Sequence, residues 1–441
     1  MSQAIVIGGS IAGLLTVRVL LDHFDHVTLL ERDQLPDGPE VRPGVPQAQH
    51  VHTLLLHGYH LLESLFPSLT TDLLAQGAQL LDWANDWKIL TMWAWMPQHQ
   101  SNLTGLICSR LLLEWYLRQQ LLQRPDFSLI DQTRAQSLVS DHLQSHITGV
   151  VIDSKTSGGA TLQANLVVDA SGRRSQLPKW LTELGYSPVE TTTVNSFFGY
   201  ASRWYEYSPE EAIKGIIITS KPGTTRRGGI VCPVEGNRCV ITLHSFEKDY
   251  PSSQEDEFLE FAKSLRDSAI YHIIQKAKPV SPIYCNRNTS NCLRHYEKLK
   301  AMPARLVTLG DAVCSFNPSY GQGMTVAALG AILLGDCLRH SSSKENLNSK
   351  FSLQFQRKLA KTLEVPWMMT TGEEFRWDMT TGDLSDWFTR KIQGYFDRVM
   401  RAATADTKIY DNFIQVAHME NSPSVLFHPR TLWKALAQSP S

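Results

Sequence analysis

Apolar runs and glycine-rich turns alternate at the start of the chain. Residues 4–7 form an uninterrupted apolar run that predicts a buried strand, and residues 11–21 place apolar side chains at helical spacing. Residues 26–31 predict a second buried strand. A strand, a glycine turn, a helix and a strand within roughly thirty residues are typical of a βαβ unit. The chain is therefore predicted to begin with a Rossmann-type α/β sheet.

The rest of the chain changes between helical and strand-like patterns. A loop rich in Pro, Gly and Gln covers residues 36–52. Helical patterns follow at residues 53–76, 108–122, 254–276 and 321–339. Strand-like patterns occur at residues 83–97, 136–170, 194–245 and 305–310, and the C-terminal part is mainly helical. This order predicts an α/β protein with a second, sheet-rich domain and C-terminal helices.

Composition and charge narrow the class of protein. The chain has 441 residues, of which 42% are hydrophobic and 19% charged, as in globular proteins of two or three domains. Its net charge of −1 gives no sign of a basic surface, so no nucleic-acid partner is expected. The seven cysteines are dispersed without metal-binding spacing, and no signal peptide or membrane-spanning run is evident. These features indicate a cytoplasmic protein.

The first candidate site is the turn that follows the first predicted strand. It reads Gly-Gly-Ser-Ile-Ala-Gly over residues 8–13, and Glu31 closes the second strand. Glycines let a pyrophosphate approach the backbone N–H groups at the positive end of a helix, and a carboxylate after the second strand can accept hydrogen bonds from a ribose. The alternative is an ordinary βα turn without a ligand. The candidates here are Gly8, Gly9, Ser10, Ala12, Gly13, Glu31 and Arg32.

The second candidate site lies far along the chain. The strand predicted at 305–310 ends in Gly-Asp, and a proline and two glycines precede the next predicted helix. Asp311 is well placed to bind a ribityl or ribose hydroxyl, and the N-terminus of the helix can stabilise the negative charge of a reduced flavin. The alternative is a plain βα crossover. The candidates are Gly310, Asp311, Pro318, Gly321, Gln322, Gly323 and Met324.

These motifs and a third resemble a known enzyme superfamily. The third stretch, residues 168–173, reads Val-Asp-Ala-Ser-Gly-Arg. The order and spacing of the three resemble the FAD-dependent monooxygenases of the aromatic-hydroxylase and squalene-epoxidase superfamily, over about the first 345 residues. Residues 42–52 and 108–114 look like the subgroup that includes bacterial polyether epoxidases. The resemblance implies a glutathione-reductase-like, Rossmann-type FAD-binding domain.

The resemblance assigns roles to matching positions. Glu31 would bind the adenosine ribose, Arg110 the pyrophosphate or its ribose, and Asp311 the flavin side, while residues 321–323 would line the isoalloxazine. Asp169 lies in a stretch linked to FAD and NAD(P)H, but here it reads Asp-Ala-Ser-Gly instead of Asp-Gly. No second glycine-rich βαβ unit is present for a nicotinamide. The resemblance implies that NADPH, NADH or a separate flavin reductase supplies the electrons.

The same resemblance implies the reaction and the domain limits. One oxygen atom of O2 would pass through a flavin C4a-hydroperoxide into an apolar isoprenoid, polyketide or aromatic molecule, by epoxidation or hydroxylation. The FAD-binding domain is predicted at residues 1–80, 103–190 and 290–345. The substrate-binding sheet domain is predicted at residues 81–102 and 191–289, and the C-terminal helical region at 346–441.

The loop at 42–52 carries polar candidates close to the predicted ribose site. Arg42, Gln49, His50 and His52 are predicted to position the flavin or its reduced anion, with Gln49 and His50 as flavin-adjacent candidates for catalysis. The alternative is that they only make hydrogen bonds within the loop. No metal site is predicted, because two histidines two residues apart lack a third ligand.

Aromatic residues suggest where an apolar substrate would bind. Trp93, Trp95, Phe198 and Tyr200 are predicted to line a substrate cavity, or alternatively to fill the core of a sheet. Residues 93–97 (Trp-Ala-Trp-Met-Pro) are also similar to a motif of flavin-dependent halogenases, which place it later in the chain and need a positioned lysine. A flavin-dependent reductase of isoprenoid double bonds and a non-catalytic carrier are further alternatives. The aromatic-rich C-terminal helices could cap the cavity, contact a membrane surface or pack on the main body.

Overall fold

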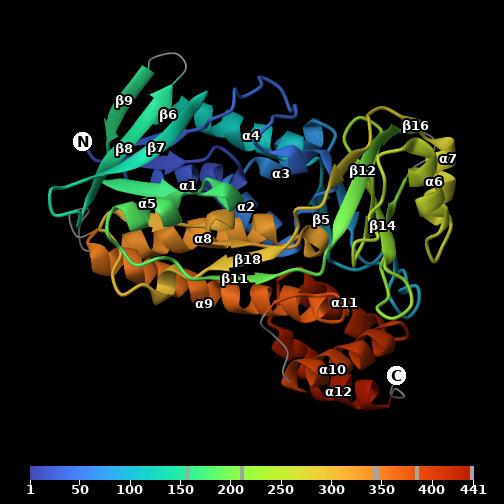
Figure 1. Cartoon of the computed structure of the whole chain (residues 1–441). Coiled ribbons are helices and arrows are strands. Elements are labelled where there is room, and N and C mark those ends of the chain that lie inside the picture. Colours follow the sequence, from blue (N-terminus) through green and yellow to red (C-terminus); the bar gives the residue numbers. More distant parts are fainter. Residues whose placement is uncertain (155–157, 209–212, 341–346, 383–386, 438–441) are drawn as a thin grey trace.

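The computed structural model describes residues 1–154, 158–208, 213–340, 347–382 and 387–437 (Figure 1). Its centre is a five-stranded parallel sheet in the order β19-β10-β1-β2-β6. The strands are β1 (Gln3–Ile7), β2 (His26–Leu30), β6 (Phe127–Ile130), β10 (Leu166–Asp169) and β19 (Leu306–Thr308). Helices cover this sheet, so its strands are nearly continuous apolar runs. The predicted Rossmann-type α/β fold is confirmed.

Helices from both ends of the chain pack around this sheet. The first is α1 (Ile11–Leu20), which packs against α8 (Gly323–Arg339). The others in this part of the chain are α2 (Leu56–Leu65), α3 (Leu69–Ala75), α4 (Arg110–Leu122) and α5 (Leu177–Glu183). Strand β19 lies beside β10, and β10 lies beside β1, although they are far apart in sequence. This pairing brings the two predicted dinucleotide motifs to the same edge of the sheet.

Gly13 shows how closely α1 sits on the end of β1. A Cβ atom at this position would lie 1.7 Å from the carbonyl oxygen of Gly8. We expect Gly13→Ala to lower the free energy of unfolding by about 1–3 kcal/mol or more, because the helix must move off the strand. Chemical denaturation measures this loss. Gly394→Ala is the control, since nothing lies within 4 Å of that Cβ; an equal loss in both variants would contradict the explanation.

The second large sheet is mixed and faces the first across the molecule. Its order is β16-β12-β15-β14-β13-β4, with β17 also paired to β12. The strands are β4 (Trp87–Leu90), β12 (Gly199–Glu206), β13 (Gly215–Ile218), β14 (Arg227–Val234), β15 (Arg238–Ser245), β16 (Lys278–Pro279) and β17 (Tyr284–Asn286). Helices α6 (Glu255–Lys263) and α7 (Ala269–Lys276) cover its outer face, in yellow in Figure 1. Its inner face is left for other contacts.

Smaller sheets complete the strand inventory. β3 (Gln79–Asp82) pairs with β5 (Thr104–Ile107). One three-stranded sheet contains β7 (Thr133–Ser140), β8 (Ile147–Ser154) and β9 (Gly158–Gln163), and the other contains β11 (Thr191–Val194), β18 (Asn291–Arg294) and β20 (Cys314–Ser315). Three predictions were too long. The strand region 83–97 contains only β4, and the helices predicted at 53–76 and 254–276 are each broken in two, between α2 and α3 and between α6 and α7.

The C-terminal helices lie against the mixed sheet rather than apart from it. After the long helix α9 (Ser349–Glu374) come α10 (Trp387–Ala403), α11 (Thr407–Ala417) and α12 (Pro429–Leu436), in red in Figure 1. Val399, Tyr410 and Ile414 share a buried cluster with Trp83 and Trp87. Within the described ranges, no helix combines the length and apolarity that a membrane span requires.

Candidate active site

A cavity of about 1150 Å³ lies between the parallel sheet and the mixed sheet. The first turn of α1 and the start of α8 line one part of it. Strands β12 to β15 and helices α9, α10 and α11 line the other part. The two predicted dinucleotide motifs therefore share one cavity, and that cavity continues toward the C-terminal helices.

The N-terminus of α1 is open to a ligand. The Gly9 N–H donates to Glu31 Oε2 over 2.8 Å, and Gly8 has a φ of +108° that glycine tolerates. The Ser10 hydroxyl donates to Glu114 over 2.9 Å and accepts from Arg110 over 2.8 Å, so it does not cap the helix. Helix N-termini carry backbone N–H groups without intrahelical partners. The first turn of α1 can therefore bind a pyrophosphate.

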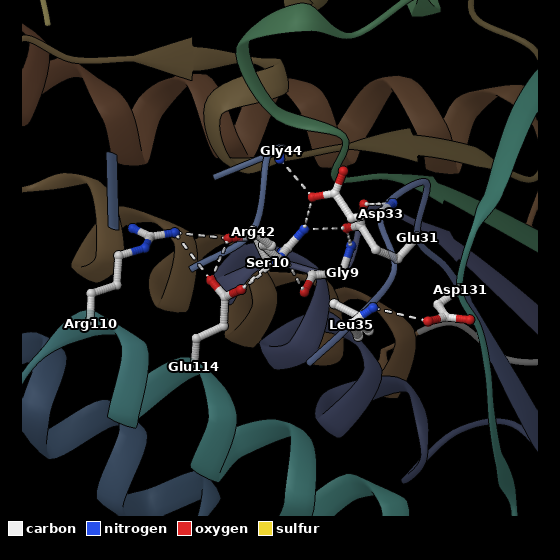
Figure 2. A network of polar contacts seen from close by, with 10 residues as sticks. All are labelled: Gly9, Ser10, Glu31, Asp33, Leu35, Arg42, Gly44, Arg110, Glu114 and Asp131. Atoms are coloured by element: carbon white, nitrogen blue, oxygen red, sulfur yellow. Dashed lines mark hydrogen bonds and ion pairs between the residues drawn. The ribbon is translucent and has the colours of Figure 1, made fainter. Parts of the chain in front are cut away.

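Arg42 holds the acidic residues around this turn together (Figure 2). Its guanidinium donates to Glu114 and Asp33, each over 2.9 Å, and to the Gly9 carbonyl over 3.1 Å, and it lies 3.1 Å from Glu31. Burial opposes its charge, but the carboxylates more than compensate and raise the Arg42 pKa. Arg42 lines the cavity and also fixes the position of Glu31.

Asp311 projects into the cavity just after β19. The Asp311 side chain is accessible from the cavity, but most of the space around it is filled by protein. This burial raises the pKa of its carboxyl, although the nearby Arg173 and Arg110 act in the opposite direction. Arg110 also lines the cavity, and its Nε is buried without a hydrogen-bond partner in the described part of the chain. Cationic groups and a carboxylate thus face the same space from different elements.

The start of α8 is the second open helix N-terminus. Gly321 has a φ of +66°, and a Cβ on Gly323 would meet nothing within 4 Å. The Gln322 side chain accepts from Thr370 Oγ1 over 2.8 Å instead of capping the helix. The positive end of α8 therefore faces the cavity, where it can stabilise an anion.

Most predicted cofactor residues reach the cavity wall, but three of them, and the flavin-adjacent candidate Gln49, do not. The wall contains Gly8, Gly9, Ser10, Ala12, Glu31, Arg32, Arg42, Arg110, Asp311, Pro318, Gly321, Gln322, Gly323 and Met324. Gly13 and Gly310 are packing positions behind it, since a Cβ on Gly310 would lie 2.8 Å from Ala12. Asp169 is also off the wall, because it accepts hydrogen bonds from Ser171 and Ser175. Gln49 uses its carbonyl to accept from Trp204.

The loop histidines lie beside the second sheet. His50 lines the cavity, its Nδ1 lies 2.8 Å from Ser202 Oγ, and its ring meets Tyr200 edge-on at 4.5 Å. His52 also lines the cavity. Burial lowers the pKa of His50 to about 4 and that of His52 to about 3, so both imidazoles are neutral at pH 7. No group of residues suited to hold a metal occurs within the described ranges.

The prediction that Trp93 and Trp95 line the substrate cavity was wrong. Phe198 and Tyr200 line it, but neither tryptophan does. Trp93 packs between Lys221 and Arg401, at 5.3 and 3.8 Å from its ring, and Trp95 is 38% exposed. The strand pattern was extrapolated through a turn at 92–94, which changes the side that each residue faces.

Other wall residues were not assigned to the cavity individually from the sequence. They come from the turn beside β4, from the inner face of the mixed sheet and from the C-terminal helices: Met92, Met96, Ile217, Ile230, His244, Phe246, Met368, Met369, Trp377, Phe396, Phe413 and His418. The spacing of apolar side chains on a helix predicts that one face is buried, but it does not identify the surface against which that face packs. The C-terminal helices therefore line the cavity and also pack on the main body, which are two of the three alternatives considered for them.

Four histidines on this wall predict a pH dependence of stability. Burial lowers the pKa of His50 and His244 to about 4 and that of His52 and His418 to about 3. An unfolded imidazole binds a proton near pH 6.5, so below that pH the unfolded state binds more protons and stability falls. Each histidine should cost about 1.4 kcal/mol per pH unit between roughly pH 6.5 and 4.

Urea denaturation at a series of pH values measures this loss. The variant His244→Phe should show a shallower decline than the wild type, because one of the four groups no longer titrates. Equal declines in the two proteins would show that His244 is not a buried neutral group.

Comparison with known proteins shows the family to which this chain belongs. The sequence model of the FAD binding domain matches residues 1–344. The chain belongs to this FAD-binding family. Protein Rv3254 of Mycobacterium tuberculosis is 31% identical over 423 residues, which cover 94% of this chain and 88% of that protein. The FAD-dependent monooxygenase asqG of Emericella nidulans is 23% identical over 356 residues, 77% of this chain and 60% of asqG.

Solved structures agree in fold. The p-nitrophenol 4-monooxygenase PnpA of Pseudomonas putida DLL-E4 has a TM-score of 0.63 at 16% identity, over 94% of this chain and 97% of PnpA. Flavin-dependent halogenases also share the fold. At such identity the likeness concerns the fold alone. The family match and the similarity to the FAD-dependent monooxygenase asqG support the assignment of this chain as an FAD-dependent monooxygenase of the aromatic-hydroxylase type.

The cavity has the groups that FAD needs. Two helix N-termini without side-chain caps face it, one for the pyrophosphate and one for the electron-rich end of the flavin. Arg110 has a buried Nε without a described partner, which an anionic ligand would satisfy. The residues present therefore fit the cofactor.

Proposed function

We propose that this monooxygenase inserts one oxygen atom of O2 into an apolar small molecule of isoprenoid, polyketide or aromatic type, by epoxidation or hydroxylation. Bound FAD, reduced by NADPH, NADH or a separate flavin reductase, would supply the electrons that activate O2. The observation that carries the proposal is the wall of the cavity beyond the flavin-binding end. It is formed by methionine, isoleucine and aromatic side chains from the mixed sheet, the loops beside it and three helices.

The protein's own residues would bind, orient and shield the substrate. Phe198, just before β12, and Tyr200, in β12, line the cavity together with Met368 and Met369 of α9, and such apolar walls exclude water from the reacting groups. Methionine side chains adapt to irregular apolar shapes. Helices α10 and α11 close the cavity on the side away from the Rossmann sheet. Rate enhancement would then come from positioning in a dry site.

Related flavoproteins catalyse two other reactions, halogenation and the reduction of isoprenoid double bonds, and the experiment below distinguishes them from oxygen insertion. A halogenase needs a positioned lysine, and none of the described residues that line the cavity is a lysine. Lys88, the nearest candidate in sequence, is exposed on β4. This observation favours oxygen insertion over halogenation. A reductase of isoprenoid double bonds would share the same apolar wall but would not consume O2.

The experiment is turnover of the FAD-loaded protein with terpenoid and polyketide alkenes under labelled O2. We expect O2 consumption that depends on an electron donor, and products that carry one labelled oxygen atom. Products with two added hydrogen atoms, formed without O2, would instead identify a reductase. Products that require halide would identify a halogenase. Either result would overturn the proposal.

A further inference from the structure

A histidine at the end of α11 has a fixed orientation in the apolar wall. His418 is 7% exposed and lines the cavity. Its Nδ1 accepts a hydrogen bond from the Leu56 N–H over 3.2 Å. Its ring meets the Trp83 ring edge-on at 4.2 Å, and Trp83 stacks on Trp87 at 4.5 Å. These contacts leave the imidazole little freedom to rotate.

The same contacts decide which ring nitrogen carries the proton. Because Nδ1 accepts from a backbone N–H, it cannot be protonated. Burial lowers the His418 pKa to about 3, so the neutral ring keeps its single proton on Nε2. In the part of the chain that the structure describes, Nε2 has no hydrogen-bond partner, and the atom is not enclosed by protein. We infer that this N–H faces the cavity.

The surroundings of this donor are apolar. Ile414 lies one turn before His418 on α11 and, like Met96, Phe413 and Leu426, lines the cavity. A ligand that brings only hydrocarbon to this position would leave the N–H without a partner, which costs free energy. Apolar pockets use a few placed polar groups of this kind to orient their ligands.

We propose that the Nε2–H of His418 donates a hydrogen bond to an oxygen acceptor of the substrate, so that the substrate is an apolar molecule bearing a ketone, ester or ether oxygen rather than a plain hydrocarbon. The proposal rests on the proposed function, since it takes the apolar part of the cavity as the substrate site. His418 is a specificity-determining residue in this account.

A purely structural role of His418 must be separated from this one. His418 also holds the start of α2, through the Leu56 N–H and through its own carbonyl, which accepts from the His57 N–H over 3.3 Å. His99 offers a matched control. It likewise contacts α11, with its Nε2 2.8 Å from Asp411 Oδ1, but it does not line the cavity.

The test is a binding titration of the oxidised, FAD-loaded protein without an electron donor. The probes are geranylacetone, an isoprenoid ketone, and the hydrocarbon in which its carbonyl is replaced by CH2, and binding is followed by the change in flavin absorption. The wild type should bind the ketone about 2- to 10-fold more tightly, the effect of one neutral hydrogen bond. His418→Phe should lose this ratio, and His99→Phe should keep it.

Three results would overturn the inference: equal binding of the two probes by the wild type, an unchanged ratio in His418→Phe, or no binding of the ketone up to its solubility. If His418→Phe does not fold, equal binding of the two probes by the wild type would still overturn the inference. Because nothing is turned over, the ratio can be read even if no substrate consumes O2. Failure of the proposed reaction and failure of this inference are therefore distinguishable.

Discussion

Replacement of Asp311 by alanine should give a folded protein that has lost most of its FAD. Asp311 faces the cavity beside the start of α8, where its carboxylate can accept from a hydroxyl of the cofactor. Loss of a hydrogen bond to a charged group costs about 1.5–3 kcal/mol, which corresponds to a roughly 10- to 100-fold larger dissociation constant for FAD. Titration of the apoprotein with FAD, followed by flavin fluorescence, measures this change.

Asp336→Ala is the control for this variant. Asp336 lies near the other end of α8, and its half-exposed side chain pairs with Arg339 away from the cavity. It should bind FAD like the wild type. The apoprotein of Asp311→Ala should be no less stable than the wild type, because burial already disfavours the charged carboxylate. A full flavin complement in Asp311→Ala would show that this carboxylate does not contact the cofactor.

Replacement of Arg42 by methionine should destabilise the protein severely. Arg42 is the shared cation of Glu31, Asp33 and Glu114, and all four side chains are at most 11% exposed. Removing one partner of a buried ion pair typically costs 3–5 kcal/mol, since a charge is left buried without compensation. We expect a loss of about that size in the free energy of unfolding, measured by urea denaturation.

Arg124→Met provides the comparison for Arg42→Met. Arg124 pairs with Asp126 over 2.7 Å, but its side chain is 43% exposed, and surface pairs contribute about 0–1 kcal/mol. A similar loss in both variants would mean that the ion pairs of Arg42 are no stronger than a surface pair. Glu31 would then owe its position to the backbone alone.

The fold could be predicted from the sequence where one local pattern decided it. Residues 4–31 carry buried strands, a glycine turn and an apolar helix in direct succession, and the structure contains that βαβ unit. The Gly-Asp segment at 310–311 and the helix after it are equally local, and parallel strand pairing brings them beside the first motif. This is why two motifs from opposite ends of the chain could be assigned to one dinucleotide.

Features that depend on distant partners were not predictable in the same way. Arg42 looked like a flavin-contacting loop residue, yet its partners are Glu31 and Glu114, and Glu114 comes from a helix much later in the chain. Trp93 and Trp95 were assigned to the cavity from an alternating pattern, but a turn reverses the phase. His418 gives no signal in the sequence, because its role depends on Leu56 and Trp83.

One FAD molecule, held between the starts of α1 and α8, underlies all the chemistry proposed for this protein. The most direct measurement is a calorimetric titration of the purified apoprotein with FAD, together with its visible absorption spectrum. We predict binding of one FAD per chain and the yellow absorption of a protein-bound flavin. A protein that stays colourless and takes up no FAD would contradict the assignment of the cavity and all the chemistry derived from it.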